Sequence, residues 1–229
     1  MGRNKMKNTS NFWNYYSNVY DLLNQFYPYQ KHLDLIYDLS APQAGKLYLD
    51  AGCGTGNLAI KLSQAGANVI GVDYSDAMLV NARKKNKKIQ FEFADLDAPL
   101  KFADNFFDGV ASNHVIAFLK EPKNTLTEIY RILKPGAMFV AATLKDHFSP
   151  VAVYKEHLKH KGWFYTFKTI FPLAGLSIAS AVILKRIREG TYHVYNEKTF
   201  LCLLKQSGFT NIKIVSSYTD QDLVAICRK

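Results

Sequence analysis

The sequence predicts an α/β protein in which helices cover both faces of a mainly parallel sheet. Between residues 46 and 145, short apolar segments alternate with helical ones of about ten residues, which is the pattern of consecutive βαβ units. The first apolar segment ends in a glycine-rich turn that leads straight into a helix. The last two apolar segments are joined by only the seven residues SSYTDQD, a connection that permits an antiparallel hairpin but no parallel crossover. We therefore expect one antiparallel strand at the end of the chain.

Residues 1–45 are expected to form a helical cover over this domain. Trp13, Tyr16 and Tyr20 recur at spacings of three or four residues, as they would on one face of a helix. The apolar pattern resumes after a break at Pro28.

Strands and helices then alternate through the core, 46–145. Ser75 is a typical N-cap for the second of these helices, and Pro135-Gly136 follows the end of the third. Expected strands are 46–51, 68–73, 88–93, 107–112 and 137–143, and expected helices are 57–64, 75–85 and 121–133. The core resumes at 197–229, with a helix at 197–206 and strands at 211–215 and 223–227. Residues 146–196 fit no βαβ unit, so we expect them to form an inserted helical lid over the substrate.

The composition is that of a globular protein with one large domain. The chain has 229 residues, 48% of them hydrophobic and 21% charged, and should bury roughly 70–75% of its unfolded surface. Its three cysteines, Cys53, Cys202 and Cys227, show no CxxC spacing, which argues against disulfides or a metal site and for a reducing, cytoplasmic location. The longest uncharged run, 169–184, is too short and too broken to span a bilayer.

The net charge of +10 indicates an acidic partner such as nucleic acid, anionic lipid or a phosphorylated substrate. The positions of the charged residues narrow the choice among these partners. Residues 145–189 hold eight Lys and Arg against three Asp and Glu, and Arg83–Lys88 (RKKNKK) ends a helix, where a solvated cationic face is favoured. The lid also carries the aromatic residues Trp163, Phe164, Tyr165, Phe167 and Phe171. Aromatic surface framed by cations favours a lipophilic acceptor or peripheral contact with an anionic membrane, and no RNA-binding module is visible.

The glycine-rich turn, Gly52-Cys-Gly-Thr-Gly56, is a candidate cofactor site. Glycines between a strand and a helix let a ligand approach the backbone closely. Asn57 stands where the dinucleotide fingerprint has its third glycine. Asp50 lies just before the turn, where it would repel a pyrophosphate but favour a cofactor that carries an ammonium and a sulfonium. S-adenosylmethionine is such a cofactor.

Two further acids follow later strands. Asp73 closes the second strand, where a carboxylate can accept both ribose hydroxyls, and Asp95 follows the third, where it can accept from the adenine amino group. Both positions lie at the carboxyl ends of strands, which is where an open α/β sheet binds its ligands.

Four segments in order resemble the class I S-adenosylmethionine-dependent methyltransferases. They are 49–57 (LDAGCGTGN), 69–79 (VIGVDYSDAML), 94–108 (ADLDAPLKFADNFFD) and 128–136 (EIYRILKPG). The resemblance implies a Rossmann-like, seven-stranded sheet whose last strand is antiparallel. It also implies S-adenosylmethionine as cofactor, with binding roles for Asp50, Gly52, Cys53, Gly54, Asp73, Tyr74, Met78, Asp95, Leu96 and Asn113.

The N-terminal segment has a likeness of its own. Tyr20-Asp-Leu-Leu-Asn24, with Trp13 seven residues earlier, is similar to the segment that opens the menaquinone/ubiquinone C-methyltransferases. This likeness implies that Tyr20 helps to close the cofactor pocket. The chain departs from that branch at Asn113-His-Val-Ile116, which replaces its Arg-Asn-Val, and it lacks the Tyr-Leu-x-x-Ser-Ile segment before the last helix.

His114 is the first candidate for a catalytic base. It follows the fourth strand, where it should lie near the transferred methyl group. His147 and His193 flank the lid and are further candidates for the pocket. A base is required only if the acceptor is a hydroxyl or an acidic carbon, whereas a neutral amine needs none.

The sequence thus predicts a single methyltransferase domain that acts on a small, lipophilic acceptor. The alternatives within this class are a quinone or phospholipid at a membrane surface, and RNA or protein. The alternatives from other classes are a non-catalytic cofactor-binding regulator and an NAD-dependent oxidoreductase.

Overall fold

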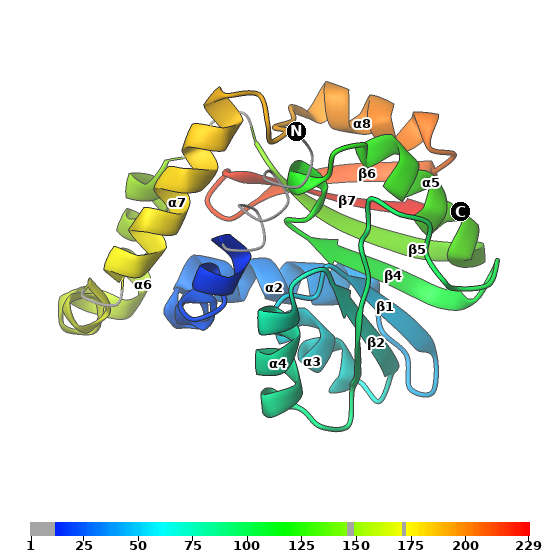
Figure 1. The fold of residues 1–229 in the computed structure, drawn as a ribbon. Coiled ribbons are helices and arrows are strands. Elements are labelled where there is room, and N and C mark those ends of the chain that lie inside the picture. The colour runs from blue at the N-terminus through cyan, green and yellow to red at the C-terminus, as the bar shows by residue number, and fades with distance from the viewer. Residues whose placement is uncertain (1–11, 146–148, 171–172) are drawn as a thin grey trace.

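A computed structural model describes residues 12–145, 149–170 and 173–229, and their side chains except those of 150, 164, 165, 167–170 and 173–179. Its centre is one seven-stranded sheet in the order β3-β2-β1-β4-β5-β7-β6 (Figure 1). The strands are β1 (Leu47–Ala51), β2 (Asn68–Asp73), β3 (Gln90–Phe93), β4 (Phe107–Asn113), β5 (Leu133–Leu144), β6 (Thr210–Ser217) and β7 (Asp222–Arg228). Strands β1 to β5 pair in parallel, and β7 is antiparallel to both β5 and β6. The predicted fold class, with its antiparallel last strand, is confirmed.

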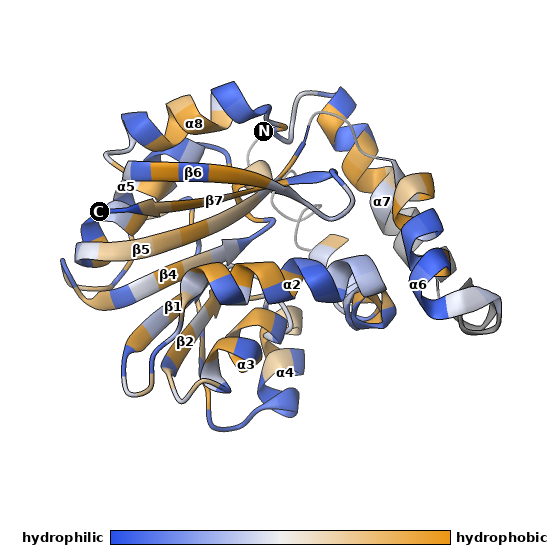
Figure 2. Cartoon of the chain, turned by 180° about the vertical axis from the view of Figure 1, so that it is seen from behind, coloured by the Kyte–Doolittle hydropathy of each residue, from blue (hydrophilic) through white to orange (hydrophobic). Residues whose placement is uncertain are grey.

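Helices cover both faces of the sheet. Their bounds are η1 (Tyr20–Gln25), α2 (Tyr27–Ser40), α3 (Asn57–Ser63), α4 (Asp76–Lys85), η2 (Ile116–Phe118), α5 (Pro122–Ile132), α6 (Pro150–Ile170), α7 (Leu173–Arg188) and α8 (Glu197–Gln206). On one face α5 and α8 bury Leu126 and Phe200, and on the other α2, α3 and α4 bury Ile36, Leu62 and Leu79. Figure 2 shows the central strands as largely hydrophobic, as expected for a sheet that is covered on both faces.

Helix α5 and strand β5 meet earlier than the sequence predicts. The expected helix 121–133 ends at Ile132, and Leu133 already pairs with Phe107 of β4. The register then shifts, and pairing resumes at Gly109 with Met138. The turn at Pro135-Gly136 therefore forms an irregularity inside a longer β5, because residues before and after the turn both pair with β4.

Strand β3 is shorter than expected and begins at Gln90. Lys88 and Ile89 are drawn into the turn before it, because their backbone N–H groups donate to Oδ1 of Asn86 at 2.9 and 3.3 Å. This side-chain turn competes with the sheet for those amides.

The insert between β5 and α8 is helical, as predicted. It forms α6 and α7, which lie together at the end of the molecule away from α5 (Figure 1). Helix α6 contacts α2, and α7 contacts η1, so the insert packs against the N-terminal segment. No helix within the described residues is long and apolar enough to cross a membrane.

Candidate functional site

A cavity of about 670 Å³ lies at the carboxyl edge of the sheet, enclosed by η1, η2 and α7. Ten of the twelve predicted site residues line it: Tyr20, Gly52, Gly54, Asp73, Tyr74, Met78, Asp95, Leu96, Asn113 and His114. The other two, Asp50 and Cys53, are buried beneath the glycine-rich turn. Residues from five separate parts of the chain therefore meet at one place because the parallel strands all end there.

The backbone N–H groups of the glycine-rich turn are already bonded within the protein. Those of Gly52 and Cys53 both donate to the carbonyl oxygen of Val72 at 2.8 Å, and that of Gly56 donates to the carbonyl of Cys53 at 2.8 Å. The N–H of Gly54 donates to Oδ2 of Asp73 at 2.8 Å. Four of the five N–H groups of Gly52–Gly56 are thus already bonded and unavailable to a pyrophosphate, whereas the carbonyl oxygens of the turn can accept from an ammonium group. This favours a cationic cofactor over a dinucleotide.

Asp73 is held between the end of β2 and this turn. Its Oδ1 accepts from the N–H of Ser75 at 2.8 Å, while Oδ2 is bonded to Gly54. Burial raises the pKa of the Asp73 carboxyl, and the N–H groups of Ser75, Gly54 and Tyr74 oppose that shift. The carboxylate therefore has a fixed orientation in the wall of the cavity before any ligand binds.

Asp50 is the uncompensated charge of the site. The residue is 1% exposed, and neither carboxylate oxygen has a hydrogen-bond partner among the residues that the structure describes. Burial raises its pKa to about 7, and the nearby Asp73 carboxylate raises it further. A buried acid of this kind is stabilised in its charged form by a nearby cation. The donor set thus fits a cofactor that carries positive charge.

The N-terminal cover is tied directly to the glycine-rich turn. Oδ1 of Asp21 in η1 accepts from the hydroxyl of Thr55 at 2.6 Å and from Nζ of Lys85 at 2.8 Å. These bonds bring the ring of Tyr20 over Gly54, where a Cβ atom would meet that ring at 3.8 Å. Tyr29 also donates its hydroxyl to that of Tyr20 at 3.3 Å.

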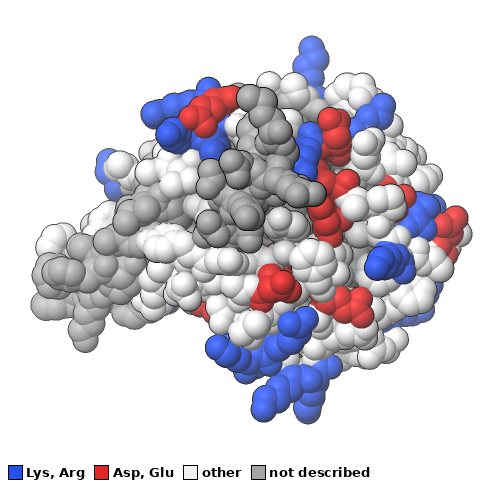
Figure 3. Space-filling view, in the orientation of Figure 1, with Lys and Arg blue, Asp and Glu red and all other residues white. Residues whose placement is uncertain are grey.

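Two members of the basic run Arg83–Lys88 are structural rather than part of a purely solvated face. Besides Lys85, Arg83 donates from Nη2 to the carbonyl of Phe91 at 2.7 Å. Figure 3 shows Lys and Arg side chains gathered at the lower end of the molecule, where α4 ends.

His114 lies at the end of β4 with a φ of 60°, and its backbone N–H donates to Ala142. Its Nε2 is 2.7 Å from Oδ2 of Asp222, the first residue of β7. The ring of His32 stacks on that of His114 at 4.7 Å. His32 in turn contacts Oδ1 of Asn113 through Nε2 at 2.8 Å and Ser217 through Nδ1 at 3.0 Å. A buried polar network therefore supports the predicted base.

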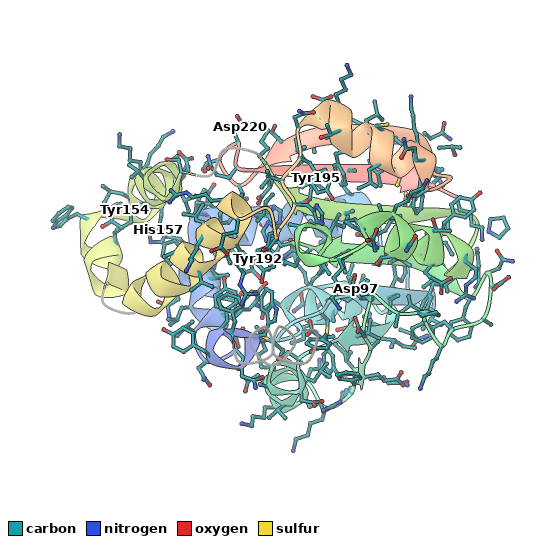
Figure 4. The ribbon with its side chains drawn as sticks, turned by 45° about the horizontal axis from the view of Figure 1, so that its top comes forward. Asp97, Tyr154, His157, Tyr192, Tyr195 and Asp220 are labelled. Carbon is teal, nitrogen blue, oxygen red and sulfur yellow. The ribbon has the colours of Figure 1, made fainter. Side chains whose placement is uncertain are left out.

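Much of the rest of the cavity is apolar and aromatic, with the charged residues Asp97, Lys120, Lys145, Arg186 and Glu189 also in its lining. It is lined from the N-terminal cover, η2, β5, α7 and the segment after α7 by Trp13, Phe118, Leu144, Ile183, Leu184, Ile187 and Tyr192. Arg186 reaches this region from α7, where Nη1 donates to the hydroxyl of Tyr192 at 2.7 Å. Figure 4 shows Tyr192 and Tyr195 on the segment that follows α7.

The comparisons with known proteins agree with this geometry. A family model described as "Methyltransferase domain" matches residues 49–141. The chain is 30% identical over 211 residues to a demethylmenaquinone methyltransferase of Staphylococcus saprophyticus, covering 87% of each protein. It is 31% identical over 212 residues to the enzyme of that name from Staphylococcus haemolyticus, covering 87% of this chain and 84% of the relative. The chain belongs to the class I S-adenosylmethionine-dependent methyltransferases.

Solved structures share the fold of this methyltransferase at low sequence identity. The [4+2]-cyclase SpnF matches with a TM-score of 0.68 and 14% identity, covering 96% of this chain and 95% of that one. A possible histamine N-methyltransferase from Thermotoga maritima matches with a TM-score of 0.64 and 19% identity, covering 96% and 99%. A cyclase and an N-methyltransferase on one fold show that the fold leaves the acceptor open.

Some sequence-based expectations lie outside the site. His193 does not line the cavity; its N–H donates to Ala117 and its ring lies 6.4 Å from that of Tyr195. Among the lid aromatics, Trp163 is 64% exposed and away from the cavity. His147, Phe171 and the side chains of Phe164, Tyr165 and Phe167 lie outside the described residues.

Sequence reasoning missed Asp222 and His32. Asp222 carried no signal because a single acid at the start of a strand also fits a hairpin turn. His32 sits in an otherwise ordinary amphipathic helix. Only the pairing of β7 with β5, and the packing of α2 on that face, bring these two residues to His114.

The side chains of His32, His114 and Asp222 are of types that ligate metals, and their donor atoms lie within 4.8 Å of one another. The two imidazole planes, however, are inclined by only 9° at 4.7 Å. Because lone pairs on ring nitrogens lie in the ring planes, parallel rings do not aim them at one ion. The arrangement fits a hydrogen-bonded network better than a metal centre.

Proposed function

We propose that this methyltransferase transfers the methyl group of S-adenosylmethionine to a small, lipophilic, aromatic acceptor of the quinone class in its reduced form. One observation carries the proposal: a single cavity joins a carboxylate-bearing end to an apolar, aromatic end, and His114 lines that same cavity. The relatives named demethylmenaquinone methyltransferases, which match most of the chain, support the same acceptor class.

At the cofactor end, S-adenosylmethionine supplies an electrophilic methyl group when bound. Carbonyl oxygens at Gly52 and Gly54, backed by the charge of Asp50, would hold its ammonium group, and Cys53 would contribute only its backbone. Asp73 would accept from the ribose hydroxyls because its carboxylate is already oriented. The remaining proposed contacts are Tyr74 and Met78 on the adenine, Asp95 and Leu96 at its edge, Asn113 beside the methionine and Tyr20 as the cover.

At the acceptor end, an aromatic wall selects for a flat, apolar molecule by burial of its surface. The guanidinium of Arg186 lies 5.5 Å from the ring centroid of Phe12 and 5.3 Å from that of Tyr192. It has no carboxylate partner among the described residues and can bind an oxygen of the acceptor.

Each of the predicted segments of the chain has its own role in this proposal. Residues 1–45 would act as the cover, 146–196 as the lid over the acceptor, and 46–145 with 197–229 as the catalytic core. Peripheral contact of the lid with an anionic membrane, and a cytoplasmic location, stay predictions from the sequence.

Binding of S-adenosylhomocysteine by calorimetry tests the cofactor end. We expect Asp73→Asn to weaken binding by about 10- to 100-fold, because a hydrogen bond to a charged group contributes about 1.5–3 kcal/mol. Asp76→Asn is the matched control, since Asp76 is exposed on the next helix and does not line the cavity. Binding of NAD in place of S-adenosylhomocysteine would contradict the proposal.

Transfer of labelled methyl groups to a panel of hydroquinones, phenols and amines tests the acceptor end. Turnover of hydroquinones above the other two classes is expected. Cofactor binding without turnover of any acceptor would favour a non-catalytic regulator instead.

A further inference from the structure

The two carboxylate oxygens of Asp222 differ in their hydrogen bonding within the described residues. Asp222 is 1% exposed and lines the cavity. Oδ2 is 2.7 Å from Nε2 of His114, while Oδ1 has no hydrogen-bond partner in the part of the chain that the structure describes. A buried carboxylate oxygen without a donor is unfavourable unless a ligand provides one. This oxygen therefore marks a place where a bound molecule donates a hydrogen bond.

We infer that Asp222 accepts the hydroxyl hydrogen of the acceptor at Oδ1 and takes its proton there, while the imidazole of His114 is hydrogen-bonded to Oδ2. This inference rests on the proposed function and specifies its substrate: the acceptor carries an ionisable hydroxyl and reacts as its oxyanion. Asp222 is then a further catalytic residue, and the predicted base His114 positions its carboxylate through Oδ2.

The surroundings of the pair suit a proton that arrives and leaves. His32 stacks on His114, and its Nδ1 is 3.7 Å from Oδ2 of Asp222. Burial lowers the pKa of His32 to about 4, with His114 lowering it further and Asp222 and Asn113 opposing the shift. His32 is therefore neutral near pH 7 and places no charge of its own beside the carboxylate of Asp222. The ring of Tyr218 packs edge-on against both histidines, with ring centroids 5.7 and 6.2 Å apart.

The reaction step balances without a further reactant. The O–H bond of the acceptor breaks and its proton goes to Oδ1 of Asp222, while Oδ2 stays hydrogen-bonded to Nε2 of His114. The electron pair left on the oxygen, or on a ring carbon conjugated with it, forms the bond to the methyl carbon, and the carbon–sulfur bond of the donor breaks with its electrons on sulfur. Where a ring carbon is methylated, that carbon loses its proton as the oxygen regains one. One proton is released per methyl group in either case.

The test compares two acceptors that differ in acidity. Rates of labelled methyl transfer are measured with 1,4-dihydroxynaphthalene, which is un-ionised at neutral pH, and with a nitro-substituted naphthol that is already ionised. General base catalysis contributes about 10²- to 10⁴-fold. We expect Asp222→Asn to lower kcat/KM about 100-fold or more on the first acceptor and less than about 10-fold on the second.

Two further variants keep this test decisive. His114→Asn should show the same selective loss, and Asn tolerates the φ of 60° at this position. Glu197→Gln is the control, because Glu197 is an exposed acid at the start of α8 and does not line the cavity. It should leave both rates within about twofold, as expected for a surface change. Calorimetry with S-adenosylhomocysteine shows whether each variant is folded.

Three results would overturn the inference while the proposed function stands. They are an equal loss on both acceptors, a rate on dihydroxynaphthalene that Asp222→Asn leaves within threefold, and a wild-type rate abolished by EDTA, which would make the cluster a metal site. Failure of the wild-type protein to methylate either hydroxyarene would instead overturn the proposed acceptor class itself.

Discussion

Gly52 shows how one residue sets the shape of the cofactor turn. Its φ is 80°, and a Cβ atom there would lie 2.1 Å from Cγ2 of Val115, so both conformation and space demand glycine. Gly45 has a similar φ of 75° but nothing within 4 Å of a Cβ atom. Comparing substitutions at Gly52 and Gly45 therefore distinguishes the cost of backbone strain from the cost of a steric clash.

We predict that Gly52→Ala destabilises the protein by about 2–4 kcal/mol, from about 1–2 kcal/mol of left-handed strain and a further overpacking cost. Gly45→Ala should cost only the strain. Chemical denaturation of both variants measures the difference, and equal losses would show that Val115 moves aside freely.

At the scale of elements, the contact between η1 and the glycine-rich turn is expected to determine how tightly the proposed cofactor is enclosed. Thr55 is fully buried, and its hydroxyl joins Asp21 of the cover to Lys85 of α4. The cover also packs against α7 of the lid. Opening of either element would therefore loosen the other.

We predict that Asp21→Ala raises the release rate of S-adenosylhomocysteine about 3- to 10-fold, because the buried Thr55 hydroxyl then loses the charged acceptor of its hydrogen bond. Stopped-flow measurement of release tests this. Asp38→Ala, at an exposed position of α2, is the control and should release the ligand at the wild-type rate. If both variants behave alike, the cover does not retain the cofactor.

For the whole molecule, the main electrostatic feature is Asp50, an acid that is buried beneath the glycine-rich turn. Burial raises the pKa of Asp50 from 3.8 to about 7 in the folded protein. Between these values the folded protein holds a proton that the unfolded chain has released. The contribution of Asp50 to stability is therefore fully present below about pH 4 and is lost as the pH rises through 7.

We predict that Asp50→Asn raises the Tm of the ligand-free protein at pH 8 and leaves it nearly unchanged at pH 4. The same variant should bind S-adenosylmethionine more weakly at pH 8, because a charged Asp50 attracts the cation. Thermal melts and calorimetry at both pH values test the two effects, and a Tm that falls at pH 8 would contradict the assigned cause.

The sequence alone determined the fold class and which residues gather at the proposed cofactor end of the cavity. Strand-to-helix turns and acids at strand ends are local patterns, and parallel strands gather their carboxyl ends at one edge. The order of residues along the chain is therefore enough to locate Gly52, Asp73 and Asp95 at that edge, where all three line the cavity. The irregular start of β5 could not be predicted, because it depends on which residues β4 pairs with.

Only the tertiary structure decided which residues meet at the proposed acceptor end of the cavity. Asp222 and His32 lie 108 and 82 residues from His114 along the chain, and neither stands in a motif. Their contact depends on the antiparallel insertion of β7 beside β5 and on the packing of α2 against that face. Local sequence specifies a turn that a cofactor can enter, whereas a hydrogen-bonded pair between distant elements exists only once the sheet has assembled.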